Sequence, residues 1–479
     1  MIKHLKRLGA DSLLYAFMNV GTKIIAFIML PIYTRFLSDP SQYGVLDYID
    51  RITSMLTFLV IFGTDSALAY YYFEAKDQKL RDYYVRTVMM FRLVIVMILG
   101  LVVFAGGDWL SELLLEETGK SYLLLIAIGT LFFDTILTLI LTVLRYDFFT
   151  KRVVFFTVLK MLLIAVVSYL MLITIWPTVT GILAARILSV GFVALLLFKY
   201  AVKYVRPYFD KKLLVEVLKY AAPLVPASLA FWVIVNANTM FLKEYTSFEE
   251  VGIYGTAIKF AALITLVTSG VQMAWRPFSM SLKDKENNAR IFSKIYMAIL
   301  LIGTFGIMIV ATIMPWVIKV LDSNYWEAYK YVALISTTTF LNFYYMIISI
   351  GIFFTKKTKY ISYAFGMAAI VNVILNIALI PKFSIWGAVA AYLLSYIVAI
   401  VYIFIRSQKL FYVPVSGMKM SIQFLWVIVS VIGIVYIQEH AAISDVNIIY
   451  VWLFYLIGLF AVGIHKDLLS KGLNEGVES

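Results

Sequence analysis

Long apolar stretches, each ended by a short polar segment, follow one another along the whole chain. A helix that crosses a membrane needs about twenty consecutive, mostly apolar residues, and about fourteen stretches meet this requirement. Their approximate bounds are Asp11–Phe36, Gly44–Tyr72, Tyr83–Ala105, Ser121–Leu144, Val153–Ile175, Val179–Phe198, Val217–Leu242, Gly252–Trp275, Ile291–Met314, Tyr331–Phe354, Tyr360–Ile380, Ile385–Ile405, Met420–Ile437 and Val446–Ile464. The pattern predicts an all-α polytopic membrane protein with about fourteen transmembrane helices.

The polar segments between these stretches alternate in charge. The N-terminal tail carries Lys3, Lys6 and Arg7, and every second loop after it is basic. The alternate loops are short and neutral or acidic, as in residues 108–117 and 439–445. Lysine and arginine collect on the cytoplasmic side of membrane proteins. This alternation and the even number of spans each predict that both termini lie in the cytoplasm; we call the opposite side of the membrane the outer side.

An internal repeat divides the chain. The stretch Phe36–Ile52 resembles Glu244–Phe260, and with Gly44 placed on Gly252, Arg51 falls on Lys259. The repeat predicts two six-helix lobes, each containing a cation inside a membrane helix. The predicted divisions are an N-terminal lobe (1–198), a cytoplasmic linker (199–216), a C-terminal lobe (217–409), two extra C-terminal helices (410–465) and a cytoplasmic tail (466–479). The linker contains an amphipathic segment that we expect on the anionic inner leaflet.

Composition narrows the possible functions. Hydrophobic residues make up 62% of the chain and charged residues 14%, whereas soluble domains are about half apolar and a quarter charged. The chain contains no cysteine, which excludes disulfides and thiolate metal sites, and its three histidines fall in terminal or loop positions. We therefore expect no metal and no cofactor. The net charge of +13 follows the loop pattern, so we expect no nucleic-acid partner.

Charged residues inside the predicted spans are the main functional signal. A lysine or arginine at the bilayer centre costs about 2.5–3.5 kcal/mol on insertion scales, so it usually faces a partner or a wet cavity. The cations in the spans are Lys23, Arg51, Arg92, Lys160, Arg186 and Lys259, and the acids are Asp47, Asp50, Asp65 and Asp134. Because the cations outnumber the acids, internal pairs cannot neutralise all of them.

We expect a central cavity lined by Lys23, Arg51 and Lys259, from the first, second and eighth spans. Such a cavity suits an anionic substrate, above all one that carries phosphate. Alternatives exist for several charges. Arg92 and Lys160 lie near cytoplasmic ends, where their side chains can extend to the membrane surface. Asp47 and Arg51 are four residues apart on one helical face and can form a structural ion pair.

Two further predictions concern movement and coupling. Pro223 and Pro226 fall inside the seventh predicted span, where they can act as a hinge or as a static kink. Asp65 or Asp134 is a candidate site for a coupling proton or sodium ion; the alternative is a paired or hydrogen-bonded acid. The chain shows no phosphate-binding glycine loop, no histidine–carboxylate pairing and no large outer loop, so we expect a protein that is not an enzyme.

Four stretches carry a resemblance to a known family. They are LPIYTRFLSDPSQYGVLDYI (Leu30–Ile49), LDSNYWEAYKYV (Leu321–Val332), GIFFTKKTKY (Gly351–Tyr360) and NVILNIALIPKFSIWGAVAAYLLSY (Asn372–Tyr396). The chain resembles the polysaccharide (Wzx-like) flippase branch of the multidrug/oligosaccharidyl-lipid/polysaccharide (MOP) exporter superfamily. This resemblance implies two six-helix lobes around a cavity that opens to alternate sides of the bacterial cytoplasmic membrane.

The resemblance also implies a substrate: an undecaprenyl-pyrophosphate-linked oligosaccharide for cell-surface polysaccharide biosynthesis, whose lipid tail stays in the bilayer. Related lipid-linked peptidoglycan precursor flippases use basic residues on the first, second and eighth helices to meet the pyrophosphate. The matching residues here are Lys23, Arg51 and Lys259, with Arg186 as a helper. Membrane lipids and polysaccharide polymerase or other assembly proteins are the implied partners.

Other functions remain open on the sequence. A lipid-linked peptidoglycan precursor flippase and a cation-coupled multidrug exporter share the expected fold. The cationic spans argue against the exporter, whose cationic substrates favour an acidic or apolar site. A membrane glycosyltransferase or polymerase predicts catalytic carboxylates on a large outer loop, and a scaffold for an assembly machine gives the buried cations no role.

Overall fold

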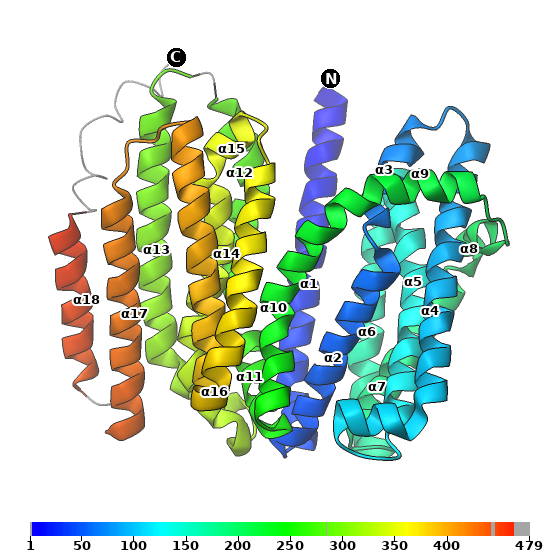
Figure 1. Cartoon of the computed structure of the whole chain (residues 1–479), viewed down its shortest axis with the longest axis horizontal. Coiled ribbons are helices and arrows are strands. Elements are labelled where there is room, and N and C mark those ends of the chain that lie inside the picture. The colour runs from blue at the N-terminus through cyan, green and yellow to red at the C-terminus, as the bar shows by residue number, and fades with distance from the viewer. Residues whose placement is uncertain (1, 284, 442–445, 464–479) are drawn as a thin grey trace. The chain divides into compact units, whose positions relative to one another are not determined.

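The computed structural model describes residues 2–283, 285–441 and 446–463, and every regular element among them is a helix (Figure 1). The predicted all-α membrane class is confirmed. The chain forms two compact units, residues 1–252 and 253–479, which we call the first and second units. The tail predicted at 466–479 lies outside the described residues, and the division into lobes, linker and extra helices stays a prediction.

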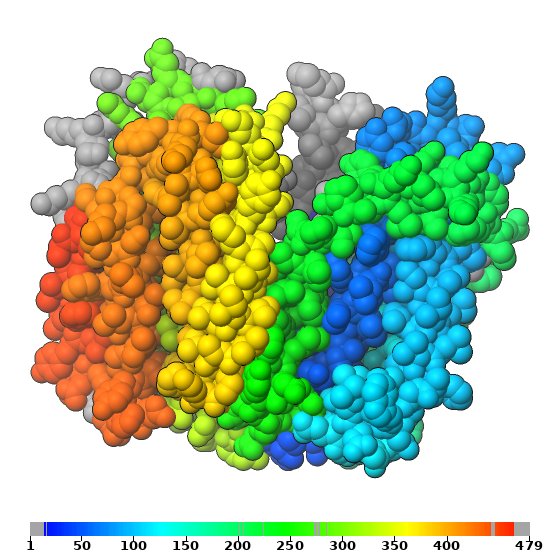
Figure 2. Space-filling model, viewed as in Figure 1, coloured from blue at the N-terminus to red at the C-terminus, as the bar shows by residue number. Residues whose placement is uncertain are grey.

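The first unit is a bundle of long helices. Its elements are α1 (Ile2–Phe36), α2 (Pro40–Ile61), α3 (Thr64–Glu74), α4 (Gln78–Leu115), α5 (Ser121–Tyr146), α6 (Thr150–Thr174), α7 (Val179–Leu196), α8 (Phe198–Val205), α9 (Lys211–Ala221), η1 (Ala222–Leu224) and α10 (Val225–Tyr245). The core forms where α5 packs against α4 and α7, and α6 packs against α7 and α1. The amphipathic α9 lies across α3 and α4, as its green surface over the blue helices shows (Figure 2).

The second unit contains the remaining helices. They are α11 (Phe248–Ala261, which begins in the first unit), α12 (Ile264–Ser281), α13 (Asn288–Val317), η2 (Ile318–Val320), η3 (Ser323–Ala328), α14 (Tyr329–Ile348), α15 (Ile350–Phe354), α16 (Lys359–Leu410), α17 (Gly417–His440) and α18 (Ile448–Val462). The last two helices pack on the bundle through α13. Gln438 donates to the carbonyl of Ala311 at 3.1 Å, and the Trp452 indole donates to Thr312 at 3.0 Å.

The long helix α16 reverses direction at Ser384, whose backbone (φ 50°, ψ −127°) is not helical. The guanidinium of Arg406 lies 5.2 Å from the ring centroid of Tyr360, although a straight helix would separate these positions by about 70 Å. A Cβ on Gly387 would lie 2.5 Å from the carbonyl oxygen of Leu379, so the tight reversal requires glycine there. Each half is long enough to cross a bilayer.

The number of membrane crossings follows from these bends. Among the described residues, eleven helices are long and apolar enough to span, and a twelfth is counted if the bent pair α11–α12 acts as one span. This count treats α16 as one helix and leaves out the shorter apolar α18. The prediction of about fourteen spans with both termini in the cytoplasm therefore stays a prediction.

The reversal in α16 can be tested by cross-linking, because the chain contains no native cysteine. We expect the double variant Tyr360→Cys/Arg406→Cys to form an internal disulfide under mild oxidation, detected by mass spectrometry of the joined peptides. The pair Tyr360→Cys/Lys382→Cys is the control, because the two residues lie at opposite ends of one half. Cross-linking of the control pair alone would contradict the reversal.

The seventh predicted span differs from the observed helix. Pro223 lies in η1, just before the seventh span, and Pro226 is the second residue of α10, so neither proline lies in the interior of this span as predicted. The residues before them belong to the amphipathic α9. Proline is tolerated in the first turn of a helix, where its missing N–H has no helical partner to lose. The prolines therefore mark the joint between α9 and the span α10.

The second and eighth spans, predicted as continuous, are interrupted instead. Phe62 (φ 44°) and Gly63 (φ 69°) both adopt left-handed backbone between α2 and α3. The break between α11 and α12 bends the eighth span by 42°. Interrupted membrane helices often mark functional positions in transporters, because their backbone groups lose helical partners.

Candidate functional site

Asp47 and Arg51 of α2 form an ion pair inside the first unit. The Arg51 Nε donates to Asp47 at 3.1 Å and Nη2 donates to the other carboxylate oxygen at 3.3 Å. The Asp47 side chain is 2% exposed and that of Arg51 is 14% exposed. The spacing of four residues places both on one helical face. The structural pair considered in the sequence analysis is therefore present, and it holds the guanidinium at a fixed place.

Two residues of α10 extend this network. Arg51 Nη1 donates to the side-chain oxygen of Asn236 at 3.1 Å, and the Asn236 amide donates to the carbonyl of Trp232 at 3.0 Å. The Trp232 indole donates to the Ser54 hydroxyl at 3.1 Å, about one turn after Arg51 on α2. The guanidinium of Arg51 therefore lies between a carboxylate of α2 and an amide of α10.

Arg186 of α7 binds Asp50 of α2. Nη1 donates to Oδ1, and Nη2 donates to Oδ2 at 3.2 Å, which makes the pair bidentate. Bidentate arginine–carboxylate pairs are among the strongest charge-assisted hydrogen bonds. Because Asp50 and Arg51 are neighbours on α2, two arginines from two helices lie close to one stretch of α2.

The other two acids in the spans are also paired. Arg92 of α4 is 1% exposed and donates to Asp65 at 2.6 Å, while Lys160 of α6 donates to Asp134 of α5 at 2.8 Å. Arg92 also donates twice to Thr64, at 2.6 and 3.0 Å, directly after the break between α2 and α3. Arg92 is therefore buried against a partner rather than extended to the membrane surface. Asp65 and Asp134, the candidates for ion coupling, are therefore each paired with a basic side chain.

The two remaining cations lie on different units. Lys23 is exposed on α1 of the first unit. Lys259 is half-buried on α11 of the second unit, and no acid among the described residues of that unit lies at ion-pair distance from it. Each of the four acids within the spans pairs with one of the other four cations.

The sequence analysis assigned no role to two polar residues of α10: Lys243, near the predicted outer end, and Asn236. Lys243 of α10 is 7% exposed, pairs with Glu116 at 3.1 Å, and lies 5.9 Å from the ring centroids of Tyr48 and Phe248. A lysine at the end of a span resembles an ordinary interfacial lysine, so its burial could not be read from its position. Asn236 had no signal beyond being polar within a span.

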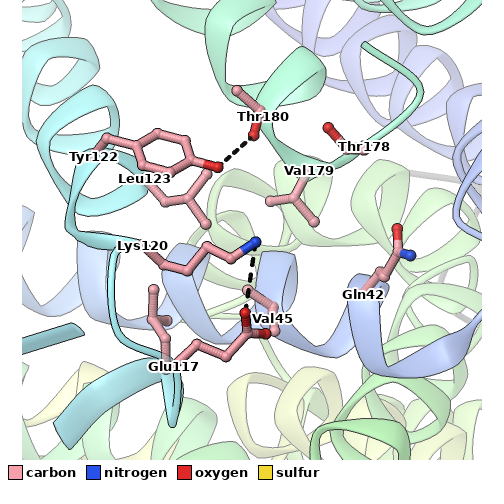
Figure 3. Close-up of a pocket in the computed structure, with 10 residues that line it drawn as sticks. Gln42, Val45, Glu117, Lys120, Tyr122, Leu123, Thr178, Val179 and Thr180 are labelled. Carbon is pink, nitrogen blue, oxygen red and sulfur yellow. Dashed lines mark hydrogen bonds and ion pairs between the residues drawn. The ribbon is translucent and has the colours of Figure 1, made fainter. Parts of the chain in front are cut away.

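A pocket of about 250 Å³ opens at the same end of the first unit (Figure 3). Lys120 points toward Glu117, with the charged atoms 3.5 Å apart, and the Tyr122 hydroxyl lies 3.2 Å from that of Thr180. Val45, Leu123 and Val179 add apolar surface. The lining thus combines hydrogen-bonding groups with apolar side chains.

The family assignment comes from comparison with known proteins. The model of a family described as polysaccharide biosynthesis protein matches residues 8–283, more than half of the chain. The chain belongs to this family. A comparison with curated protein sequences finds no match.

Solved structures show which proteins share the fold of this chain. The chain is similar to the lipid II flippase MurJ in an inward closed conformation, with 16% identity, 95% of this chain and 98% of that chain covered and a TM-score of 0.62. It is also similar to the MATE multidrug transporter DinF-BH (15% identity, 85% and 96% covered, TM-score 0.58). A third match is a MOP superfamily transporter from Pyrococcus furiosus (15% identity, 83% and 95% covered, TM-score 0.54).

These identities are low, so the structural matches establish the fold alone. The chain has the flippase fold of the MOP superfamily, as the resemblance in the sequence analysis predicted. Together with the family match, they describe a membrane protein of the polysaccharide biosynthesis family with the fold shared by MurJ and the MATE transporters.

Proposed function

We propose that the protein moves an undecaprenyl-pyrophosphate-linked oligosaccharide across the bacterial cytoplasmic membrane, as a transporter without catalytic activity. The observation that carries this proposal is the family match over residues 8–283. The arginines held along α2 add a chemical reason, because guanidinium groups bind phosphate oxygens in the same bidentate geometry as carboxylates.

The proposed pyrophosphate site contains Lys23, Arg51 and Lys259, with Arg186 as a helper. Asp47 and Asp50 keep two of these cations neutralised while no substrate is bound, which lowers the cost of holding them in the membrane. An incoming pyrophosphate competes with these carboxylates for the guanidinium groups. Asn236 then holds Arg51 in place during the exchange. The joint at Pro223 and Pro226 is the proposed hinge, and Asp65 or Asp134 the proposed coupling acid.

Flipping of a fluorescent undecaprenyl-pyrophosphate oligosaccharide in proteoliposomes tests this proposal. We expect Lys23→Ala, Arg51→Ala and Lys259→Ala each to reduce the flipping rate by about 10- to 100-fold, since a hydrogen bond to a charged group contributes about 1.5–3 kcal/mol. Lys243→Met is the matched control, because Lys243 of the span α10 pairs with Glu116, which has no part in the proposed mechanism. It removes another ion-paired cation of a span but none of the proposed site, and its rate should stay near that of the wild type.

Because Arg51→Ala leaves Asp47 buried without its partner, the double variant Asp47→Asn/Arg51→Gln completes the experiment. It removes both charges but keeps hydrogen-bonding groups of similar size. If the double variant folds and flips at the wild-type rate, Arg51 does not bind substrate. Flipping by the wild type and by every variant would support the flippase function but reject the proposed pyrophosphate site.

The same vesicles separate the alternative functions. Transport of a lipid-linked peptidoglycan precursor, without transport of the oligosaccharide, would favour the peptidoglycan precursor flippase. Efflux of a cationic dye, without flipping of either lipid, would favour the multidrug exporter.

A further inference from the structure

The stretch Leu321–Val332, singled out in the sequence analysis, forms a short turn between α13 and α14 in the second unit. Asp322 begins η3 by accepting a hydrogen bond from the Asn324 amide at 3.1 Å. Residues three apart lie on one side of a 3₁₀ helix, and accordingly Tyr325 and Ala328 are both fully buried. Trp326, between them, is 39% exposed. The turn therefore presents a large ring to its surroundings.

Trp326 borders a pocket of about 260 Å³. Its indole N–H donates to the carbonyl of Leu321 at 3.1 Å, which fixes the plane of the ring, and the amine of Lys319 lies 5.6 Å from the ring centroid. Across the pocket, the amine of Lys330 lies 3.0 Å from Glu439 and 3.6 Å from Glu327. Glu439 belongs to α17, so one of the last two helices completes the pocket.

The chemistry of this pocket indicates its ligand. Two lysines and two glutamates give a formal charge of zero, with donors and acceptors side by side. The carboxylates disfavour a phosphate, and the four charges disfavour an apolar ligand. The pocket has the volume of on the order of eight water molecules, which is enough for one six-membered sugar ring. An exposed ring beside alternating donors and acceptors suits the apolar face and hydroxyl edge of such a sugar.

We propose that this pocket binds one pyranose unit of a saccharide at the predicted outer side. Trp326 stacks against the face of the sugar ring, and Glu327, Lys330 and Glu439 hydrogen-bond to its hydroxyls. The identification of the sugar as part of the transported substrate rests on the proposed function. The site gives α17 a role in recognition, in addition to its packing on α13.

The first unit provides an internal comparison. Glu117 and Lys120 occupy the turn before α5 with the spacing that Glu327 and Lys330 have at the start of α14, and their charged atoms lie 3.5 Å apart compared with 3.6 Å. Both pairs line a pocket of similar volume. The described lining of the first pocket includes no tryptophan, which makes it a matched control within the same chain.

Saturation-transfer NMR on the purified full-length protein in detergent tests the proposal. The probes are methyl glycosides of common hexoses, 6-deoxyhexoses and N-acetylhexosamines. We expect at least one glycoside to receive saturation from the wild type, Trp326→Ala and Glu439→Gln to reduce this signal by more than fivefold, and Trp326→Phe to keep most of it. Lys120→Met, in the other pocket, should leave the signal unchanged.

Two results would overturn the proposal: no glycoside gives a signal, or the signals are the same in folded Trp326→Ala and Glu439→Gln as in the wild type. Gel filtration and thermal unfolding establish whether the variants are folded. If Trp326→Ala does not fold, the signal of Glu439→Gln decides the test. The flipping assay is separate. Sugar binding without flipping would support this sugar site and reject the proposed function. Flipping without sugar binding would support the proposed function and reject the sugar site.

Discussion

Replacing Gly44 by alanine is expected to lower the melting temperature of the purified protein by about 5 °C or more. A Cβ at this position would lie 1.8 Å from the carbonyl oxygen of Phe248 and 3.0 Å from the amide nitrogen of Gly252. These are backbone atoms, which cannot rotate away as a flexible side chain can. The beginnings of α2 and α11 would have to separate, and the nearby Tyr48–Phe248 ring contact at 5.7 Å would be lost.

The contact is reciprocal within residues 1–252. A Cβ on Gly252 would lie 2.0 Å from the carbonyl oxygen of Pro40, as one on Gly44 would meet that of Phe248. Gly252→Ala should therefore destabilise the protein to a similar degree. Gly21→Ala in α1 is the control, because a Cβ there meets nothing within 4 Å. If thermal unfolding in detergent gives Gly44→Ala and Gly21→Ala the same melting temperature, the close approach of the two helices is wrong.

Replacing Arg92 by methionine is expected to reduce the free energy of unfolding by about 3 kcal/mol. The substitution deprives Thr64 and Asp65 of their donor at the break between α2 and α3. Asp65 is 42% exposed, so part of its charge can be solvated; we therefore expect the lower end of the range known for broken buried pairs. Chemical unfolding of the purified protein measures this effect.

Two variants decide the origin of this effect. The double variant Arg92→Met/Asp65→Asn should recover part of the stability, because it no longer leaves a carboxylate without its partner. Lys160→Met breaks the pair with Asp134, whose cation is 21% exposed compared with 1% for Arg92 and makes, among the described residues, no further hydrogen bond to a threonine, so it should cost less. Equal losses for Arg92→Met and Lys160→Met would show that burial of Arg92 does not determine its contribution.

The membrane helices could be predicted from the sequence because their signal is local. A run of apolar residues predicts a span without knowledge of its neighbours, and the two halves of α16 were each recognised in this way. Local patterns failed at helix ends and breaks. The apolar residues of α9 run on toward α10, so the seventh span was predicted to begin too early. Phe62 adopts left-handed backbone that its residue type does not indicate.

The charged residues of the candidate site could be listed from the sequence, but most could not be paired. Asp47 and Arg51 are four residues apart, so helical periodicity alone brings them together. Asp50 and Arg186 are 136 residues apart, and Arg51 and Asn236 are 185 apart. Such partners depend on which helices pack together, and the apolar surfaces of membrane helices contain little information about that choice.

The pairing of Asp50 with Arg186 also sets an order for biosynthesis. At about 5–20 residues per second, a ribosome needs about 1–5 s to make Arg92 after Asp65, but about 7–27 s to make Arg186 after Asp50. Asp50 is therefore synthesised well before its cation exists. During this interval α2 has to remain near the insertion machinery, or Asp50 has to stay protonated. Arrival of α7 is thus the earliest point in translation at which this ion pair can close.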